Sequence, residues 1–268
     1  MTFEERKAQV RSYLGKTVKI IIDRPIGYEH KKEGYCIFYP VNYGYIPEVI
    51  GGDGEELDVY LLGVNEPVDE YVAKIIGIVH RENDVEDKLI AAPAGVAFDK
   101  YEIEEEVSFQ EKYYKTEIEA LYEKSCGTVS YTLINGTVHY LLIHSRDGNC
   151  GFPKGHIEKG ESEIDTALRE TFEETSVKVD ILQGFRREIN YTMCNGKEKT
   201  AVYFLANYSN QIPVHNLGFE DNDYLVLPFE DAFNSLTFEN TRHLLKEAND
   251  YLLKTLLKRE KIIFPKSF

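Results

Sequence analysis

The chain has 268 residues, of which 43% are hydrophobic, so it is long enough to form two domains that each bury a core. Its formal net charge of -15 disfavours binding to a nucleic-acid backbone, although a small polyphosphate can bind with divalent cations between the two negative partners. No apolar run approaches the length of a membrane span, the N-terminus lacks the pattern of a signal peptide, and the four cysteines show no paired ligand spacing. We therefore expect a cytoplasmic protein with reduced thiols and without a membrane partner. The sequence specifies no oligomeric state.

The first 122 residues predict a small, mainly antiparallel β-barrel with flanking helices. Thr2 and Glu5 have the spacing of a helix-capping box, and Gly15 is expected to end the helix that begins there. Short runs rich in β-branched and aromatic residues then alternate with glycine and proline turns, which is typical of a small barrel of the OB-like kind. The predicted strands are residues 18–22, 37–39, 59–62, 72–78 and 89–92.

Two acidic segments in this half have the composition of a metal site. The first is a turn with Asp53, Glu55 and Asp58, which follows the run Tyr-Pro-Val-Asn-Tyr-Gly-Tyr-Ile-Pro at residues 39–47. The second lies at residues 84–88 and reads Asp-Val-Glu-Asp-Lys. Carboxylates of this kind gather divalent cations, which neutralise pyrophosphate and activate water.

Together these segments resemble the core of the soluble family I inorganic pyrophosphatases, which have a Tyr-Pro-x-Asn-Tyr-Gly-Tyr strand and then Asp-Gly-Asp-x-x-Asp. Gly27 falls near a position where that family has a basic residue, so positive groups for the substrate are scarce. We therefore expect metal binding with weak or absent pyrophosphatase activity. The alternatives are a genuine second activity and a metal- or nucleotide-binding regulatory module. The resemblance implies metal ligands at Asp53, Asp58, Asp84 and Asp87 and substrate contacts at Tyr43 and Lys88.

The junction between the two halves is expected near residues 122–125. There a charged, helix-like segment at residues 115–123 gives way to a strand-like segment at residues 126–131. We therefore predict two independently folded domains, at residues 1–122 and 123–268.

In the second half, residues 155–174 combine a glycine-rich loop with a helix that crowds glutamates together. Helical spacing places Glu170 and Glu174 on one face, with Glu173 beside Glu170. Such like-charge neighbours destabilise a helix unless a cation compensates them, and Mg²⁺ is the usual cation where phosphate completes the coordination. The alternative is a solvated acidic face, but the coincidence of glycines, an arginine and this spacing favours a metal site.

The same helix carries signals for its start and its buried side. Ser162 and Asp165 form a capping pair, so the helix should begin just after Glu161. Ile164, Leu168 and Thr175 lie roughly on one stripe, and we expect them to pack inward while the glutamates face a cleft.

The spacing resembles the Nudix box, which is a glycine, five residues, a glutamate, seven residues, and then Arg-Glu, an apolar residue, any residue and Glu-Glu. Two positions depart from it: Thr171 stands where the family has an aliphatic residue, and Ser176 where it has a glycine. The glycine position often has a left-handed backbone, so the serine is expected to cost stability but to remove no ligand. The resemblance implies an α/β/α sandwich with a mixed sheet. The matching residues are Gly155, Glu161, Arg169, Glu170, Glu173 and Glu174.

Other matches resemble the branch of that family that cleaves dinucleoside tetraphosphates asymmetrically. They are Gly-Phe-Pro-Lys-Gly-His at residues 151–156 and Lys-Thr-Ala-Val-Tyr-Phe-Leu-Ala at residues 199–206. The alternatives are that Tyr203 is a core aromatic and that Glu220 belongs to an acidic surface loop. The chain has no tryptophan, so the family's base-stacking tryptophans are missing and the nucleotide specificity stays open. The resemblance implies that Lys154, Lys199 and Tyr203 contact the substrate and that Glu220 is a further metal ligand.

The leading prediction is Mg²⁺-dependent hydrolysis, with Mn²⁺ as the alternative ion, of a phosphoanhydride bond in a nucleoside polyphosphate such as diadenosine tetraphosphate. One glutamate accepts a proton from the attacking water, and the sequence does not say which. Other Nudix substrates, a second pyrophosphatase activity and a nucleotide sensor without turnover are the alternatives. The intact glutamates argue against the sensor. The resemblance implies catalytic roles for Arg169, Glu170, Glu173 and Glu174, with the three glutamates and Gly155 at the metal.

Overall fold

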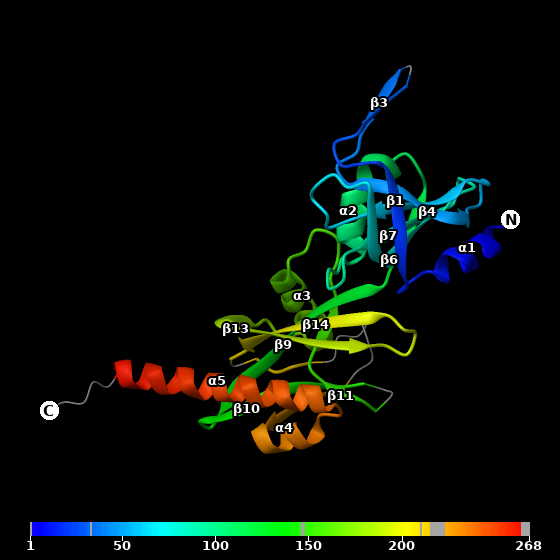
Figure 1. Cartoon of the computed structure of the whole chain (residues 1–268). Coiled ribbons are helices and arrows are strands. Elements are labelled where there is room, and N and C mark those ends of the chain that lie inside the picture. The colour runs from blue at the N-terminus through cyan, green and yellow to red at the C-terminus, as the bar shows by residue number, and fades with distance from the viewer. Residues whose placement is uncertain (1, 33, 146–147, 210, 215–222, 264–268) are drawn as a thin grey trace. The chain divides into compact units, whose positions relative to one another are not determined.

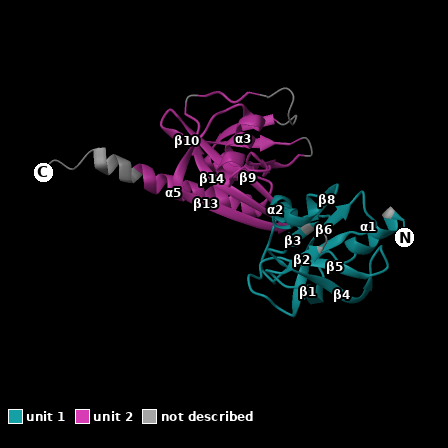
Figure 2. Cartoon of the chain, turned by 90° about the horizontal axis from the view of Figure 1, so that it is seen from above, with its two compact units in different colours: residues 1–123, 193–198 teal, residues 124–192, 199–268 magenta. Residues whose placement is uncertain are grey.

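The computed structural model describes residues 2–32, 34–145, 148–209, 211–214 and 223–263 (Figure 1). The chain divides into two compact units, drawn in separate colours in Figure 2: unit 1 contains residues 1–123 and 193–198, and unit 2 contains residues 124–192 and 199–268. Each unit has hydrophobic clusters of its own. Within the described ranges, no helix combines the length and the apolar composition needed to cross a membrane.

Unit 1 is built mainly from strands, with one helix before them and one between the last two. These elements are α1 (Phe3–Arg11), β1 (Thr17–Arg24), β2 (Glu29–Lys32), β3 (Tyr35–Phe38), β4 (Asn42–Ile50), β5 (Glu56–Leu61), β6 (Glu70–Arg81), β7 (Lys88–Ala92), α2 (Lys100–Glu111) and β8 (Thr116–Ala120).

Five strands of unit 1 close into a barrel. Hydrogen bonds join them in the order β1-β4-β5-β7-β6, and β1 also pairs with β6, which closes the circle. All of these pairs are antiparallel except β5 with β7. Val107 of α2 packs into a buried cluster with Tyr60, and Val10 of α1 packs into another with Ile20. The predicted barrel with flanking helices is therefore confirmed.

Two local predictions in unit 1 are wrong. Helix α1 ends at Arg11 rather than at Gly15, because the chain has already turned toward the sheet: the Gly15 amide donates to the Ile75 carbonyl on β6 at 2.8 Å. The segment at residues 115–123 is not helical but contains β8. Its charged and apolar residues alternate with a period of two, so Ile118 and Ala120 are buried while Glu117 is exposed.

Unit 2 contains one sheet and three helices in the part of the chain that the structure describes. The elements, of which β9 and β14 begin in residues assigned to unit 1, are β9 (Tyr122–Ile134), β10 (Thr137–His144), β11 (Cys150–Gly151), β12 (Lys154–His156), α3 (Glu163–Thr175), β13 (Asp180–Thr192), β14 (Glu198–Asn207), β15 (Asp223–Pro228), α4 (Phe229–Ser235) and α5 (Glu239–Ile263).

The sheet of unit 2 is mixed and lies between helices. Its strand order is β11-β10-β9-β14-β13, with β12 also on β9 and β15 also on β10. Strands β9 and β10 are antiparallel. Strand β14 runs parallel to β9, because the amides of Glu198 and Tyr208 donate to the carbonyls of Leu121 and Tyr131, so the residue numbers rise together.

Helices cover both faces of this sheet (Figure 1). Ala167 of α3 packs against Cys126 and Phe204, whereas Ala232 of α4 and Leu245 of α5 belong to a separate cluster on the other face. Neighbouring residues of a strand point to opposite faces, which is why the even-numbered residues of β9 meet α3 and the odd-numbered ones meet α4 and α5. The predicted α/β/α sandwich is confirmed.

Helix α3 begins at Glu163, one residue later than predicted, but its cap and its end are as the sequence predicts. Ser162 is its N-cap in a capping box with Asp165, and Ser176 follows its last residue with φ 58°. The predicted inward stripe is only partly correct, because Ile164 is 44% exposed. The buried residues are instead Thr166, Ala167, Thr171 and Thr175, whose small side chains let the helix lie close to the sheet.

Replacing Ser176 with glycine should raise stability by about 1 kcal/mol, because glycine adopts a left-handed backbone without a Cβ penalty. Scanning calorimetry of the full chain would measure this as a higher melting temperature for the transition of unit 2. Ser176→Ala is the matched control and should not stabilise the protein. An unchanged melting temperature for the glycine variant would contradict the strain at this position.

Candidate functional site

The loop before α3 and the helix itself meet at Gly155. Strand β12 pairs with β9, which sets Gly155 opposite Cys126. A Cβ on Gly155 would lie 2.0 Å from the carboxyl carbon of Glu170, so only glycine allows this approach. The backbone amide of Lys154 donates to Glu174 Oε2 at 3.0 Å. Glu170 and Glu174, one helical turn apart, therefore both approach the backbone at residues 154–155.

Arg169 organises the carboxylates of this site. Its Nε and Nη2 donate to the two oxygens of Glu161 at 2.6 and 2.8 Å. Its Nη1 reaches Glu170 at 2.7 Å and Glu173 at 3.1 Å, and its Nη2 also donates to the carbonyl of His156 at 3.0 Å. A planar guanidinium with five donors can hold several acceptors in fixed directions, which a lysine cannot do.

The environment separates the protonation behaviour of two glutamates. The hydrogen bonds from Arg169 lower the pKa of Glu161 to about 2, so Glu161 stays ionised and acts as a fixed partner of the arginine. Burial raises the pKa of Glu170, although Arg169 opposes the shift. The pKa values of Glu161 and Glu170 are thus shifted in opposite directions, although both side chains accept hydrogen bonds from Arg169.

The residues present fit a magnesium ion. Hard oxygen donors are available from Glu170, Glu173 and Glu174 and from the backbone of Gly155, whose missing side chain leaves room beside Glu170. Among the described residues no three His, Cys, Asp or Glu side chains already stand together as a metal-binding group. Here the glutamates turn to Arg169 and to the loop amide instead, so binding an ion requires their side chains to rotate.

The remaining residues predicted for this site lie in different environments. Lys199 is buried on β14, with its Nζ 3.1 Å from Nε2 of His156, and so faces the same loop. Tyr203 is 2% exposed and packs edge-on against Phe152 in the core, which corrects its prediction as a substrate contact: its ring is a packing residue. Glu220 lies outside the described residues.

A chain of hydrogen-bonded, buried hydroxyls connects β9 to α3. Thr171 donates to the carbonyl of Ala167 at 2.7 Å, which leaves its oxygen to accept from Thr128 at 2.7 Å. Thr128 in turn pairs with Ser130 at 2.6 Å. Each hydroxyl has one hydrogen, so the donors must run from Ser130 through Thr128 and Thr171 to the helix backbone. Thr171 stands where the Nudix box has an aliphatic residue, and polar residues on β9 therefore compensate for its buried hydroxyl.

Thr171→Val and Thr128→Val should each lower the free energy of unfolding by about 2 kcal/mol, because each removes two buried hydrogen bonds, at about 1 kcal/mol each, and keeps the shape of the side chain. The double variant should lose less than the sum, since both changes remove the same bond. Calorimetric melting of the unit 2 transition measures the cycle, with the exposed Thr137→Val as control. Strict additivity would contradict direct coupling.

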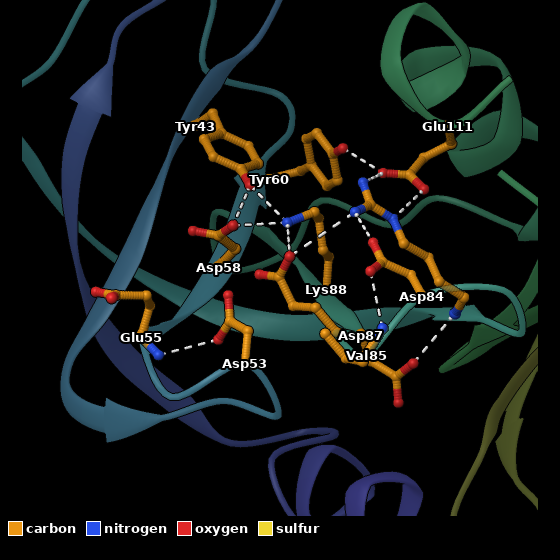
Figure 3. Close-up of polar contacts among 12 residues, drawn as sticks. Tyr43, Asp53, Glu55, Asp58, Tyr60, Asp84, Val85, Asp87, Lys88 and Glu111 are labelled. Carbon is orange, nitrogen blue, oxygen red and sulfur yellow. Dashed lines mark hydrogen bonds and ion pairs between the residues drawn. The ribbon is translucent and has the colours of Figure 1, made fainter. Parts of the chain in front are cut away.

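Unit 1 holds a second cluster of polar residues at the barrel, shown in Figure 3. Lys88 is 2% exposed, and its Nζ donates to Asp58 at 2.6 Å, to Glu86 at 2.7 Å and to the hydroxyl of Tyr43 at 2.8 Å. Tyr43 donates its own hydroxyl to Asp58. The side chain of Arg24 stacks over the Tyr43 ring, 5.0 Å from its centroid. The predicted substrate contacts Tyr43 and Lys88 thus lie beside Asp58 but are bound to it.

A buried arginine completes this cluster. Arg81 is 2% exposed and holds Glu111 of α2 with two hydrogen bonds of 2.9 and 2.6 Å. Its Nη1 donates to Asp84 at 3.0 Å and lies 3.7 Å from Glu86. Tyr60 also donates to Glu111, as Figure 3 shows. Asp84, predicted as a metal ligand, is therefore a partner of this arginine.

Two other predicted metal ligands of unit 1 have partners other than Lys88. Asp87 is 1% exposed and accepts hydrogen bonds from the Arg81 amide at 3.1 Å and from His80 at 3.3 Å, with Arg6 3.2 Å away. Buried groups thus contact both of its oxygens, and its role as a metal ligand stays a prediction. Asp53 is exposed in the turn before β5, where it accepts from the Glu55 amide at 3.0 Å.

Sequence reasoning placed Glu86 in the acidic run at residues 84–88, but it did not assign Arg81 or Glu111 to this cluster. Residues two apart in an extended segment share a face, which joins Glu86 to Lys88 and separates both from Asp87. Arg81 and Glu111 have no local signal, since the barrel and α2 bring them together across thirty residues of chain.

Glu86 makes the stability of unit 1 depend on pH. Burial, together with the neighbouring Asp58, raises the pKa of Glu86 from 4.5 to about 7, although Lys88 opposes the shift. A raised pKa means that the contribution of the group to stability is complete below its unfolded value and is lost as the pH rises through the folded value. The relevant window therefore runs from pH 4.5 to about 7.

The melting temperature of wild-type unit 1 minus that of Glu86→Gln should accordingly fall as the pH is raised through this window. Calorimetry at several pH values measures the difference. Glu119→Gln is the control, because burial is outweighed there by Arg11 and His80 and its pKa is lowered, which places its effect below the window. A difference for Glu86→Gln that stays constant with pH would contradict the assigned shift.

Comparisons with known proteins agree with the division of the chain into two units. The NUDIX domain family model matches residues 126–248, and the inorganic pyrophosphatase family model matches residues 16–125. The bis(5'-nucleosyl)-tetraphosphatase [asymmetrical] of Mus musculus is 34% identical over 143 residues, which cover 49% of this chain and 97% of that protein. The chain is a Nudix hydrolase. The predicted enzyme class, a hydrolase of phosphoanhydrides, is thereby confirmed.

The Nudix hydrolase also carries the pyrophosphatase-like half that the sequence predicts. An inorganic pyrophosphatase of Rickettsia conorii is 30% identical over 112 residues, which cover 35% of this chain and 63% of that protein. The chain thus spans less than two thirds of this relative. A crystal structure of a C. elegans Ap4A hydrolase binary complex matches with 25% identity and a TM-score of 0.46, covering 49% of this chain and 98% of that chain.

Proposed function

We propose that the Nudix half hydrolyses bis(5'-nucleosyl) tetraphosphates asymmetrically, with Mg²⁺ as the cofactor and Mn²⁺ as the alternative ion. The observation that carries the proposal is the convergence of Glu170 and Glu174 on the Lys154–Gly155 step, with Arg169 holding the neighbouring carboxylates. The 34% identity to the mouse enzyme over 97% of its length supports this substrate class. We assign the activity to a domain at residues 123–268, preceded by a domain at residues 1–122.

Glu170, Glu173, Glu174 and the backbone of Gly155 would hold the ion. A bound divalent ion neutralises phosphate charge and lowers the pKa of a coordinated water. One of these glutamates would accept a proton from the coordinated water, and burial raises the pKa of Glu170. Arg169 would keep the glutamates oriented, and Glu161 would keep Arg169 in place through their paired hydrogen bonds.

Lys199 and Lys154 would supply positive charge to the polyphosphate. Lys199 lies beside His156, so a phosphate oxygen entering at this loop would meet an ammonium group at a site largely shielded from water. Charge of this kind stabilises the negative charge that develops during phosphoanhydride cleavage. A cytoplasmic location and the absence of a nucleic-acid substrate stay predictions.

A substrate panel distinguishes the candidate functions. The purified chain with Mg²⁺ or Mn²⁺ would be given diadenosine tetraphosphate, a nucleoside triphosphate, a nucleotide sugar, capped RNA and pyrophosphate, and the products would be separated by chromatography. Asymmetric cleavage of diadenosine tetraphosphate yields AMP and ATP, whereas symmetric cleavage yields only ADP. Preference for the nucleoside triphosphate, the nucleotide sugar or capped RNA would replace the proposed substrate and keep the Nudix chemistry. Turnover of pyrophosphate would indicate a second activity. No turnover of any compound would favour a sensor.

Glu174→Gln should lower kcat for diadenosine tetraphosphate by at least ~100-fold, because it removes a charge from the proposed metal site without a change in volume. Circular dichroism should show an intact fold. Glu188→Gln, an exposed change on β13, is the control and should keep the parent rate. Turnover by folded Glu174→Gln close to the parent rate would rule out the proposed role of this glutamate.

A further inference from the structure

One arginine at the polar cluster of the pyrophosphatase-like unit leaves most of its donors unused. The side chain of Arg24 is 29% exposed, and among the described residues its one hydrogen bond runs from Nη1 to the hydroxyl of Tyr39 at 2.8 Å. Its Nε lies 3.8 Å from Oδ2 of Asp23, which is longer than a hydrogen bond. Because a guanidinium group has five N–H donors, most of the donors of Arg24 are available to a ligand.

The other two cations of this cluster are already bonded to carboxylates. Lys88 and Arg81 are each 2% exposed in their side chains. Lys88 donates to two carboxylates at 2.6 and 2.7 Å, and Arg81 holds Glu111 with hydrogen bonds of 2.9 and 2.6 Å. A phenol is a neutral acceptor, so Tyr39 positions the guanidinium of Arg24 without neutralising its charge. Of the three cations, Arg24 is therefore the one without a carboxylate at hydrogen-bond distance.

A β-bulge in β1 turns Arg24 toward this cluster. Ile22 pairs with Gly44 on β4 and Arg24 pairs with Tyr43, so β1 contributes one residue more than β4 at this point. In a regular strand, residues two apart share a face. Here Ile22 lies in the buried cluster on the side of α1, whereas Arg24 lies over the ring of Tyr43, which belongs to the cluster on the side of α2. The bulge thus aims the guanidinium at the polar cluster, as bulges do beside many sites.

Two tyrosine rings hold the guanidinium without using its donors. The Cζ atom of Arg24 lies 5.0 Å from the centroid of the Tyr43 ring and 5.5 Å from that of Tyr39, and both distances are typical of cation–π contacts. The Nζ atom of Lys88 lies 5.4 Å from the same Tyr43 centroid, so two cations adjoin one ring. A planar guanidinium held in this way can donate to two oxygens of one phosphate group.

We propose that Arg24 binds a phosphate group at the polar cluster of the pyrophosphatase-like unit. The ligand is a diphosphate, either inorganic or part of a nucleotide, and Arg24 donates to the oxygens of one of its phosphates. Arg24 thereby supplies from β1 a positive group that Gly27 lacks. The amide of Gly27 donates to the carbonyl of Tyr39 at 2.8 Å, so both residues contact the same tyrosine. The binding assigned to Arg24 does not depend on which nucleotide the Nudix half cleaves.

Titration calorimetry of the full-length chain with two probes tests the proposal. Imidodiphosphate, a non-hydrolysable relative of pyrophosphate, represents the inorganic source, and ADP represents the nucleotide source. Glu170→Gln/Glu174→Gln is the background, since it disables the proposed metal site of the Nudix half, and Mg²⁺ is present throughout. Adding Arg24→Gln should weaken the binding of at least one probe by at least ~10-fold, because it removes hydrogen bonds between charged groups. The probe that loses more affinity identifies the source.

Arg11→Gln is the matched control, because it removes the same charge from a side chain of unit 1 that is 63% exposed. It should leave the affinity for both probes unchanged. Phenylglyoxal, which modifies arginine side chains, gives a second measurement that needs no change at Arg24. The probe should slow the modification of Arg24, followed by mass spectrometry of its peptide, and should not slow that of Arg11.

Three results of the titrations would overturn the proposal. One is that neither probe binds to the background. Another is a folded Arg24→Gln variant that binds both probes as tightly as the background. The third is an equal loss of affinity in Arg11→Gln and Arg24→Gln, which would indicate an effect of net charge alone. If Arg24→Gln fails to fold, the modification experiment decides, and an unchanged rate at Arg24 in the presence of either probe would overturn the proposal.

Discussion

Carboxylates gathered within a few ångströms repel one another, and in each unit of this protein a cationic side chain offsets that repulsion. In the Nudix half the cation is Arg169, whose side chain is 22% exposed and which reaches Glu161, Glu170 and Glu173. In the pyrophosphatase-like half it is Lys88, which is 2% exposed. The two cations differ in exposure. Glutamates that meet a partly exposed arginine can exchange that contact for a metal ion, whereas the ion pairs of a buried ammonium group are costly to break, because breaking them leaves buried charge without compensation.

The Nudix site was largely predictable because its parts lie close together in the sequence. Helical spacing alone places Glu170 and Glu174 one turn apart, the Ser162–Asp165 pair marks the start of the helix, and the position of Ser176 predicts its left-handed backbone. The buried face of α3 was harder to predict. Thr171 is polar but buried because β9 supplies hydroxyl partners, and hydrophobicity along the helix carries no information about a partner on another element.

The pyrophosphatase-like barrel was predictable as a fold but not as a site. Turns and β-branched runs locate strands, but the composition of the polar cluster depends on the face of the sheet to which each side chain points after the strands pair. Glu86 and Asp87 are adjacent in the sequence and face different surroundings, so a motif that treats them as one acidic run assigns the wrong member. Likewise the charged residues before β9 suggest a helix until the pairing of β8 with β6 shows that their period is two.

The shape of the barrel is set by packing and strand pairing. The five strands close, and buried clusters support them on the side of α1 and on the side of α2, although the chain covers only 63% of the Rickettsia pyrophosphatase. Packing and strand pairing need only apolar residues and a matching register, and these do not require a metal. Arg81 and Lys88 pair with the carboxylates of the cluster, and removing either cation would leave buried charge without compensation. The ion pairs of this cluster are therefore part of what the fold of unit 1 depends on.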